Sequence, residues 1–370
     1  MNASLHHQPD LSADLFCQVV DNLGDIGVMW RLARQLTQEK GWQIRLWVDK
    51  LAQFKRIEPA IDAHLPRQTC QAIEVCQWLD AWVPVTPHPI VIAGFSCALP
   101  DEYVKQLAGH PGSIWLQLEY LSAEDWVDSF HGLHSQRNDT LKPLFFFPGF
   151  TERTGGLMRE QGLLEQRNQW QMSQQPGPWL SSLGVNLTEP ARLVSVFTYS
   201  HAPLHLLIHQ LRQTGERFHL LMPSGQSMPI CPEGEQVTWQ AIEFLNQPDY
   251  DKLLWSCDLN LVRGEDSFMR AIWAGKPLFW QIYPQTDGAH HAKLDAWLRL
   301  SCPPSPVASA MREWADGKLN TDLTHYLTGT GWESWQQTSA AWCHELAQQS
   351  DLATRLDTAV CNQIGPSDRL

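Results

Sequence analysis

Two turns in this sequence combine carboxylates and glycines in a way that could support chemistry. The first lies in Leu15 to Gly27 (LFCQVVDNLGDIG), where the apolar run Leu15 to Val20 predicts a buried strand. Asp21 and Asn22 follow that strand, and Asp25 comes four positions after Asp21. Open α/β folds bind ligands at the carboxyl edge of a parallel sheet, so these carboxylates are candidates for a general base. The alternative is that Asp21 and Asn22 only shape the turn and Asp25 caps the next helix.

The second turn, Arg263 to Ser267 (RGEDS), follows an expected strand at Asp258 to Val262 and opens an expected helix. The N-terminus of a helix presents N–H groups and a positive dipole end, which suit a phosphate or diphosphate. Ser267 adds a hydroxyl donor, whereas the side chains of Glu265 and Asp266 would have to turn away from an anion. Ordinary helix capping by these acids is the alternative.

Together the two turns suit transfer of a group from a phosphate-activated donor, held in a cleft between two domains. One domain would bind the leaving diphosphate, and the other would present a carboxylate base to the acceptor. No metal is expected, because helix N–H groups and Ser267 can stabilise the developing charge.

His205 and His209 lack a third ligand and the Glu of HExxH, so we expect them on a helix surface. His290 and His291 are expected on a helix or its cap, with a chance of reaching the cleft.

Apolar periodicity predicts the elements that would position these turns. Val28 to Lys40 predicts an amphipathic helix and Gln43 to Val48 the next strand, which gives a β-α-β unit. Pro89 to Phe95 and Ser113 to Leu118 predict further buried parallel strands. The first turn matches neither GxGxxG nor GxxxxGK[ST], so the sequence predicts no dinucleotide or P-loop site there.

Two more stretches belong to the first half. Glu119 and Tyr120 follow a predicted strand at another possible carboxyl edge, although a capping role for Ser122 and Asp125 is the plainer explanation of that segment. Leu144 to Gly156 (LFFFPGFTERTGG) predicts an aromatic strand that ends in a turn, and we expect it to be packed along a cleft.

The second half repeats this architecture without repeating the sequence. Gln174 to Trp179 (QQPGPW) is rich in Pro, Gln and Gly and predicts a linker. Ala191 to Tyr199 and Phe218 to Met222 predict strands, and Asp249 to Trp255 predicts a helix. We therefore expect an N-terminal Rossmann-like domain over 1–175, a C-terminal one over 176–350, and a C-terminal helix over 351–370 that packs back on the N-terminal domain.

Composition excludes several functions. The 27 Lys and Arg against 40 Asp and Glu argue against general nucleic-acid binding. No apolar run is long enough for a membrane span, and residues 1–10 lack the apolar core of a signal peptide, so a cytoplasmic protein without a membrane partner is expected. The nine cysteines contain no CxxC pair, which indicates reduced core thiols rather than disulfides or a zinc site.

Four stretches, FCQVVDNLGDIGVMWRLARQL, LEYLSAEDW, FFFPGFTERTGGL and LVRGEDSFMRAIWAGKP, resemble the bacterial EarP family of protein-arginine rhamnosyltransferases over nearly the whole chain. The resemblance implies an α/β GT-B fold, with two Rossmann-like domains facing across a cleft. It also implies an inverting transfer of rhamnose from dTDP-β-L-rhamnose to an arginine of translation elongation factor P, without a metal or other cofactor.

The same resemblance implies roles for individual residues. Asp25 would be the general base, Asp21 its companion on the acceptor side, and Glu265 the second essential acid. Asp266 and Ser267 would bind the diphosphate. Further residues expected on the donor side are Asn22, Leu23, Gly24, Phe197, Tyr199, Gln247, Arg263 and Gly264.

Two alternatives stay open from the sequence. One is a GT-B glycosyltransferase that uses another nucleotide sugar and another acceptor. The other is a non-catalytic module whose acidic cleft docks a basic loop of a protein partner.

Overall fold

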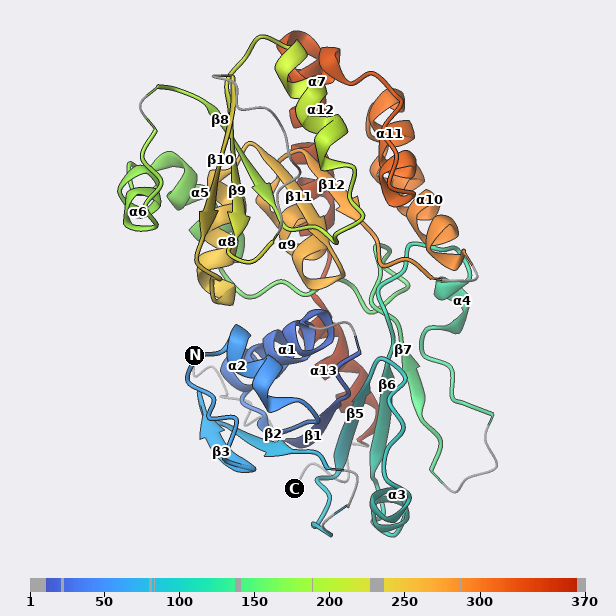
Figure 1. Cartoon of the computed structure of the whole chain (residues 1–370). Helices are drawn as coiled ribbons and strands as arrows, with labels where there is room; N and C mark the ends of the chain where they lie inside the picture. Colours follow the sequence, from blue (N-terminus) through green and yellow to red (C-terminus); the bar gives the residue numbers. More distant parts are fainter. Residues whose placement is uncertain are drawn as a thin grey trace, which may run out of the picture. The chain divides into compact units, whose positions relative to one another are not determined.

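The computed structural model describes residues 11–20, 23–79, 82, 84–136, 141–187, 189–226, 236–285 and 288–364. The chain divides into two compact units, each with its own sheet (Figure 1). The first unit contains Met1–Leu121, Trp126–Gln161 and Ser350–Leu370, and the second contains Ser122–Asp125 and Gly162–Gln349. In the part of the chain that is described, no helix has both the length and the apolar character needed to cross a bilayer.

The first unit has a seven-stranded sheet in the order β3-β4-β2-β1-β5-β6-β7. β3 runs antiparallel to β4, and the other neighbouring strands are parallel. The strands are β1 (Ser12–Cys17), β2 (Gln43–Val48), β3 (Arg67–Cys70), β4 (Ile73–Gln77), β5 (Ile90–Gly94), β6 (Ile114–Leu118) and β7 (Leu144–Phe146). The helices are α1 (Gly24–Lys40), α2 (Leu51–Ile57), α3 (Asp101–Ala108), α4 (Val127–Phe130) and α13 (Leu352–Gln363).

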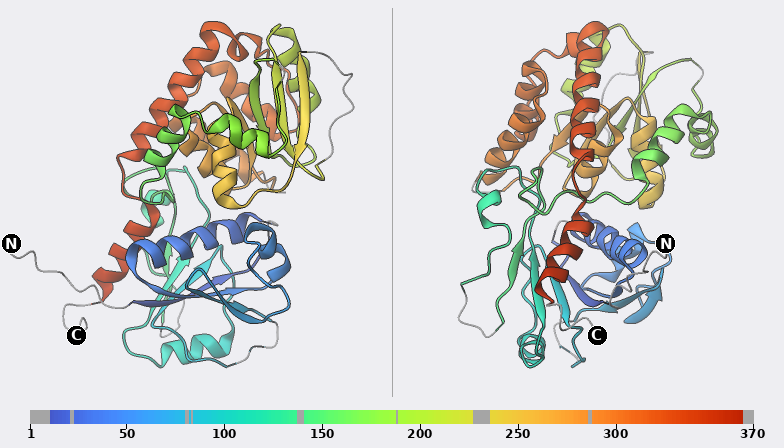
Figure 2. Two further views of the ribbon diagram at one scale, coloured as in Figure 1. Left: turned by 90° about the vertical axis from the view of Figure 1, so that its left-hand side faces the viewer. Right: turned by 180° about the vertical axis from the view of Figure 1, so that it is seen from behind.

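Helices α1 and α3 cover opposite faces of this sheet (Figure 2). On the α3 side, Phe16 packs with Trp47 and with Tyr103 of α3 in one buried cluster. On the α1 side, a β-carbon added to Gly94 would lie 2.8 Å from the sulfur of Met29. Glycine at the end of β5 therefore allows α1 to approach the sheet closely.

The second unit has a five-stranded, fully parallel sheet in the order β10-β9-β8-β11-β12. Its strands are β8 (Arg192–Val196), β9 (Phe218–Pro223), β10 (Val237–Ile242), β11 (Leu259–Arg263) and β12 (Leu278–Gln281). Its helices are α5 (Leu163–Met172), α6 (Pro176–Ser182), α7 (Leu204–Gln213), α8 (Gln247–Ser256), α9 (Asp266–Ala274), α10 (Ala289–Ser301), α11 (Ser305–Ala315), the short 3₁₀ helix η1 (Thr324–Leu327) and α12 (Gly329–Ala347).

Apolar side chains of these strands bind the flanking helices to the sheet. Leu193 of β8 and Leu221 of β9 pack with Leu253 of α8 in one buried cluster. On β12, the ring of Phe279 lies 5.3 Å from that of Trp314 on α11, measured between centroids. The continuous apolar runs of the central strands are typical of parallel strands that are covered on both faces.

Several predicted elements are confirmed, but the turn between β1 and α1 begins earlier than the sequence predicted. β2 spans the predicted range Gln43–Val48. β1 ends at Cys17 rather than Val20, because the backbone N–H groups beyond it bind the carboxylates of Asp49 and Asp25 instead of a strand. α1 starts at Gly24 rather than Val28, so Asp25 is part of its first turn.

The expected linker at Gln174–Trp179 coincides largely with helix α6, whose first residue is Pro176. Proline suits this position, because the N–H that it lacks would have no partner in the first turn. The second unit already begins at Gly162, ahead of the expected boundary at 175/176. The reason is that α5 packs on α8, where Trp170 Nε1 donates a hydrogen bond to Ser256 Oγ at 3.0 Å.

The C-terminal helix α13 belongs to the first unit. It packs against α1, and the indole Nε1 of Trp42 donates to Asp357 Oδ1 at 2.9 Å. At the start of the helix, Asp351 accepts hydrogen bonds from the backbone N–H of Thr354 and from Gln35 Nε2, both at 3.0 Å. Helix α13 is thus built into the core of the first unit.

Candidate active site

Both sheets have one point from which successive strands wind outward in opposite directions. In the first unit this switch point lies between β1 and β5, and in the second it lies between β8 and β11. In open α/β sheets, ligands bind outside the carboxyl ends of the strands at such a point. The residues that follow these four strands are therefore the structural candidates for a site.

In the first unit, Asp25 lies just beyond the end of β1 and is 3% exposed. Its Oδ2 accepts a hydrogen bond from the backbone N–H of Val20 at 2.8 Å, and its Oδ1 accepts one from the Tyr120 hydroxyl at 3.5 Å. The N-cap of α1 is Leu23, and no side chain caps it. The carboxylate is thus held between the end of β1 and the segment after β6.

The turn before α1 is only partly described. Leu23 is the N-cap residue and Gly24 is the first residue of the helix. Asp21 and Asn22, which the sequence singled out as catalytic and donor-binding candidates, lie outside the described residues.

In the second unit, two aromatic residues after β8 and the last residue of β11 form an aromatic and cationic group. The guanidinium of Arg263 lies 4.5 Å from the ring centroid of Phe197 and 4.8 Å from that of Tyr199. Its Nη1 donates to the backbone oxygen of Thr198 at 3.2 Å, and the backbone N–H of Tyr199 donates to Gln281 Oε1 at 2.6 Å. Phe197, Tyr199 and Arg263 thus lie together at the switch point, with the guanidinium packed over both rings.

The turn from β11 into α9 is held by hydrogen bonds from side chains to its backbone carbonyls. Gly264 has φ +62°, a left-handed conformation that favours glycine, and its carbonyl accepts a hydrogen bond from Trp280 Nε1 at 2.8 Å. Ser267 is buried, and its hydroxyl donates to the carbonyl of Arg263. The α9 N-cap residue, Glu265, makes no side-chain capping bond. The first turn of α9 therefore presents N–H groups without an intrahelical acceptor, as an anion site requires.

A buried ion pair fixes α8 against α9. Arg270 Nε and Nη2 donate to the two carboxylate oxygens of Asp251 at 2.9 and 2.6 Å, and both side chains are almost fully buried. One turn earlier on each helix, Gln247 Nε2 donates to Asp266 Oδ2 at 3.3 Å. The structure therefore brings Gln247 and Asp266 together at the N-terminal ends of α8 and α9.

The carboxylate of Glu265 turns toward α10. Its Oε1 lies 2.7 Å from Lys293 Nζ, and both side chains are largely buried. Lys293 was not among the residues that the sequence indicated, because a lysine in the middle of a helical stretch carries no distinguishing signal. The contact pairs the acidic side chain at the α9 N-cap with a lysine of α10.

Glu119 and Tyr120, of which Tyr120 contacts Asp25, are predicted from the sequence only as residues at a possible sheet edge. Tyr120 stacks on Phe95, with ring centroids 4.7 Å apart and planes 24° apart, and Ser96 Oγ donates to the Glu119 carboxylate at 3.0 and 3.2 Å. Burial raises the pKa of Glu119, although the Ser96 hydrogen bond opposes this. The available signal was a strand that ends directly before an acidic and an aromatic residue, and the topology brings Tyr120 into contact with Asp25.

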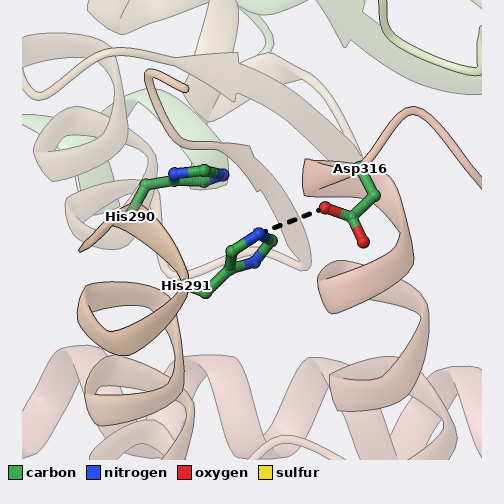
Figure 3. A group of neighbouring side chains, drawn as sticks. All are labelled: His290, His291 and Asp316. Carbon is green, nitrogen blue, oxygen red and sulfur yellow. Dashed lines mark ion pairs between the residues drawn. The ribbon is translucent and has the colours of Figure 1, made fainter. Parts of the chain in front are cut away.

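His290, His291 and Asp316 form a further group of close ligand-type side chains (Figure 3). His291 Nε2 lies 3.3 Å from Asp316 Oδ1, and His290 Nδ1 accepts a hydrogen bond from the Gln285 backbone N–H at 3.1 Å. The imidazole rings are packed on each other, 4.1 Å apart between centroids. In these contacts, His290 Nδ1 accepts a hydrogen bond and His291 pairs with a carboxylate. Such contacts are typical of polar side chains at the start of a helix, here α10, rather than of three ligands arranged around a metal ion.

The other histidine pair also fits the expectation. His205 and His209 lie on α7 and are exposed, so they are a helix-surface pair as predicted. His209 contacts the side chain of Gln213 one turn further along the helix, with 3.2 Å between the two nitrogens.

Comparison with known proteins relates the chain to one family of enzymes. Residues 13–360 match the family described as elongation factor P (EF-P) rhamnosyltransferase EarP. The protein-arginine rhamnosyltransferase of Pseudomonas putida KT2440 is 42% identical over 364 residues, covering 93% of this chain and 97% of that protein. The protein of the same name from Pseudomonas aeruginosa PAO1 is 42% identical over 366 residues, with the same coverage of both chains.

Solved structures of glycosyltransferases are similar to this chain in fold. A structure concerning EarP-mediated arginine glycosylation of translation elongation factor EF-P aligns with a TM-score of 0.63 and 30% identity, covering 95% of this chain and 99% of that one. The spinosyn rhamnosyltransferase SpnG, complexed with thymidine diphosphate, aligns with a TM-score of 0.53 at 12% identity, covering 94% and 99%. The predicted α/β class with the GT-B fold is confirmed by these neighbours and by the two sheets, one mainly and one fully parallel.

Proposed function

This chain belongs to the EarP family of EF-P rhamnosyltransferases and is an enzyme of the protein-arginine rhamnosyltransferase class, and from this premise we propose its donor, acceptor and mechanism. The donor is dTDP-β-L-rhamnose, and the acceptor is an arginine side chain of translation elongation factor P. The observation that carries the proposal is the family match over residues 13–360, which includes both acidic turns.

The acceptor chemistry explains why a carboxylate is needed. An arginine guanidinium has a pKa above about 12 and no free lone pair, so it is a poor nucleophile. In the proposed reaction, a guanidinium nitrogen forms a bond to the anomeric carbon while the bond from that carbon to the diphosphate oxygen breaks. The proton lost by nitrogen passes to the carboxylate of Asp25, and dTDP leaves with the bonding electron pair. Asp21 is proposed as the companion of Asp25, and Glu265 as the second essential acid.

The donor side is proposed to use the switch point of the second unit. The ring faces of Phe197 and Tyr199 and the amide of Gln247 would contact the nucleotide, and the N–H groups at the start of α9 would bind the diphosphate. The Ser267 hydroxyl is already engaged by the Arg263 carbonyl, so the backbone N–H of Ser267 is the group proposed to meet the phosphate. Other residues proposed for the donor side are Arg263, Gly264, Asp266, Asn22, Leu23 and Gly24.

The reaction can be tested by weighing the acceptor. The purified protein is incubated with EF-P and dTDP-β-L-rhamnose, and the intact mass of EF-P is measured with and without EDTA. We expect a gain of one deoxyhexose in both conditions, and no gain when the target arginine of EF-P is replaced by lysine. If EF-P gains no mass, the proposed donor or acceptor is wrong; if another nucleotide sugar is transferred instead, the donor assignment fails.

A further inference from the structure

A strained turn follows β5 at the switch point of the first unit. Phe95 and Ser96 have φ +56° and +57°, a left-handed conformation that is uncommon for residues other than glycine. Two such residues in succession cost free energy, and they persist only where their surroundings hold them. At this turn, the surroundings are the residues directly after β6.

Both strained residues contact that segment. The Phe95 ring stacks on Tyr120, and the Ser96 hydroxyl donates to the carboxylate of Glu119. The backbone adds a further tie, since the N–H of Phe95 donates to the carbonyl of Leu118 at 2.7 Å. The turn therefore fixes the position of the Tyr120 ring through the Phe95 ring, which stacks on one of its faces.

Tyr120 differs from its neighbours in exposure. Its side chain is 37% exposed, whereas Phe95 behind it is 9% exposed and Asp25, to which its hydroxyl donates, is 3% exposed. An aromatic ring fixed in this way, with accessible surface next to a carboxylate, suits a guanidinium group. The planar cation can stack on the ring while its N–H groups reach the carboxylate.

We infer that Tyr120 determines specificity for arginine on the acceptor side: its ring is the surface on which the acceptor guanidinium stacks, and its hydroxyl orients the Asp25 carboxylate. This inference rests on the proposed function, because it assigns the acceptor subsite of that reaction. A lysine ammonium is a compact, strongly hydrated charge without a planar face, so it gains less from such a surface.

Three substitutions separate the two roles. Tyr120→Leu removes the π-face and hydroxyl but keeps apolar bulk, and the acceptor KM should rise about ten-fold while the donor KM stays within about two-fold. Tyr120→Trp keeps a π-face, so its acceptor KM should stay near that of the wild type. Tyr120→Phe keeps the ring but loses the hydroxyl, and it should lower kcat with little change in acceptor KM. Tyr326→Leu, in η1 of the second unit, is the matched control and should change none of these constants.

A binding measurement makes the inference independent of turnover. Saturation-transfer NMR with N-acetylarginine amide and N-acetyllysine amide should show contact with the arginine probe in wild-type protein, and loss of that contact in Tyr120→Leu. Unfolding midpoints check that each variant is folded. The inference is overturned if Tyr120→Leu keeps both the wild-type acceptor KM and the arginine contact, or if its donor KM rises as much as its acceptor KM. If EF-P gains no rhamnose but the arginine contact still depends on Tyr120, the proposed function fails, and only the assignment of Tyr120 as a surface that binds a guanidinium stands.

Discussion

Asp25 is the residue on which the proposed reaction depends most, since the guanidinium must lose a proton as the new bond forms. Asp25→Asn keeps the shape of the side chain and removes the base, so kcat should fall by about 100- to 10,000-fold. Affinity for dTDP, measured by titration calorimetry, should stay unchanged, because Asp25 is assigned to the acceptor whereas Phe197, Tyr199 and Gln247 are assigned to the nucleotide. Asp101→Asn is the matched control, because Asp101 also lies in a helix first turn but is exposed. A loss of dTDP affinity as large as the loss of rate would contradict the role of Asp25.

Lys293 offers a second test at a single residue. Lys293→Met leaves the Glu265 carboxylate without its ion-pair partner close to the proposed diphosphate site, so affinity for dTDP should fall about ten-fold, roughly 1.4 kcal/mol. Lys293→Arg should retain most of the affinity. The double variant with Glu265→Gln should recover it, because the repelling charge is then absent. Unchanged dTDP binding in Lys293→Met, or a double variant as weak as the single one, would show that the ion pair does not protect the anion site.

Between elements, the Arg270–Asp251 pair is expected to hold the donor-side helices α8 and α9 together. Asp251→Ala leaves a buried guanidinium without its partner, and it should lower the free energy of unfolding by about 3–5 kcal/mol. Asp249→Ala is the control: it removes a partly exposed pair with Lys252 on the same helix and should cost less than about 1 kcal/mol. Urea unfolding of both variants measures the difference, and equal losses would mean that the buried pair has no special role.

A second buried cluster ties β1 to β2 and α3. Burial by itself would raise the pKa of Asp14, but hydrogen bonds from Arg45, Tyr103 and the His88 backbone bring it below its usual value. Arg45 Nε and Nη2 lie 2.5 and 2.7 Å from the carboxylate, and the Tyr103 hydroxyl lies 2.5 Å from it.

A lowered pKa in the folded state means that this carboxylate stabilises the fold above the unfolded pKa of about 3.9, and that the contribution is lost as pH falls through the folded value. Asp14→Asn should therefore be clearly less stable than the wild type at pH 7. The difference in urea midpoint should shrink as pH is lowered below about 4. A difference that is independent of pH would show that packing, rather than the charge on Asp14, is lost in the variant.

The sequence predicted the central strands and the helix after β11 well, because apolar runs bounded by Gly and charged turns are local signals. It did not predict β3, an antiparallel edge strand in which only Cys70 is buried. Nor did it predict the true end of β1, since Val19 and Val20 have strand-forming side chains but donate to carboxylates. Contacts such as Glu265 with Lys293, or Tyr120 with Asp25, join residues 28 and 95 positions apart, and only the folded topology reveals them.

For the whole molecule, the two units supply different halves of one proposed reaction. The first unit carries a buried carboxylate beside an exposed aromatic ring. The second carries a helix N-terminus, an arginine over two aromatic rings, and a buried network that fixes α8 and α9. A net charge of −13 suits a basic acceptor group rather than a nucleic-acid backbone. Neither unit alone holds both the base and the expected anion site, so activity should require the intact chain.

The most direct test of this account is the configuration of the sugar on the product. A single displacement with one base must invert the anomeric carbon, so dTDP-β-L-rhamnose should give α-linked rhamnose on the arginine nitrogen. NMR of the modified arginine peptide, through the one-bond carbon–proton coupling at the anomeric position, measures this configuration. An α-linked product that Asp25→Asn fails to form is the predicted result. A β-linked product, or the same product formed at the wild-type rate without the Asp25 carboxylate, would contradict it.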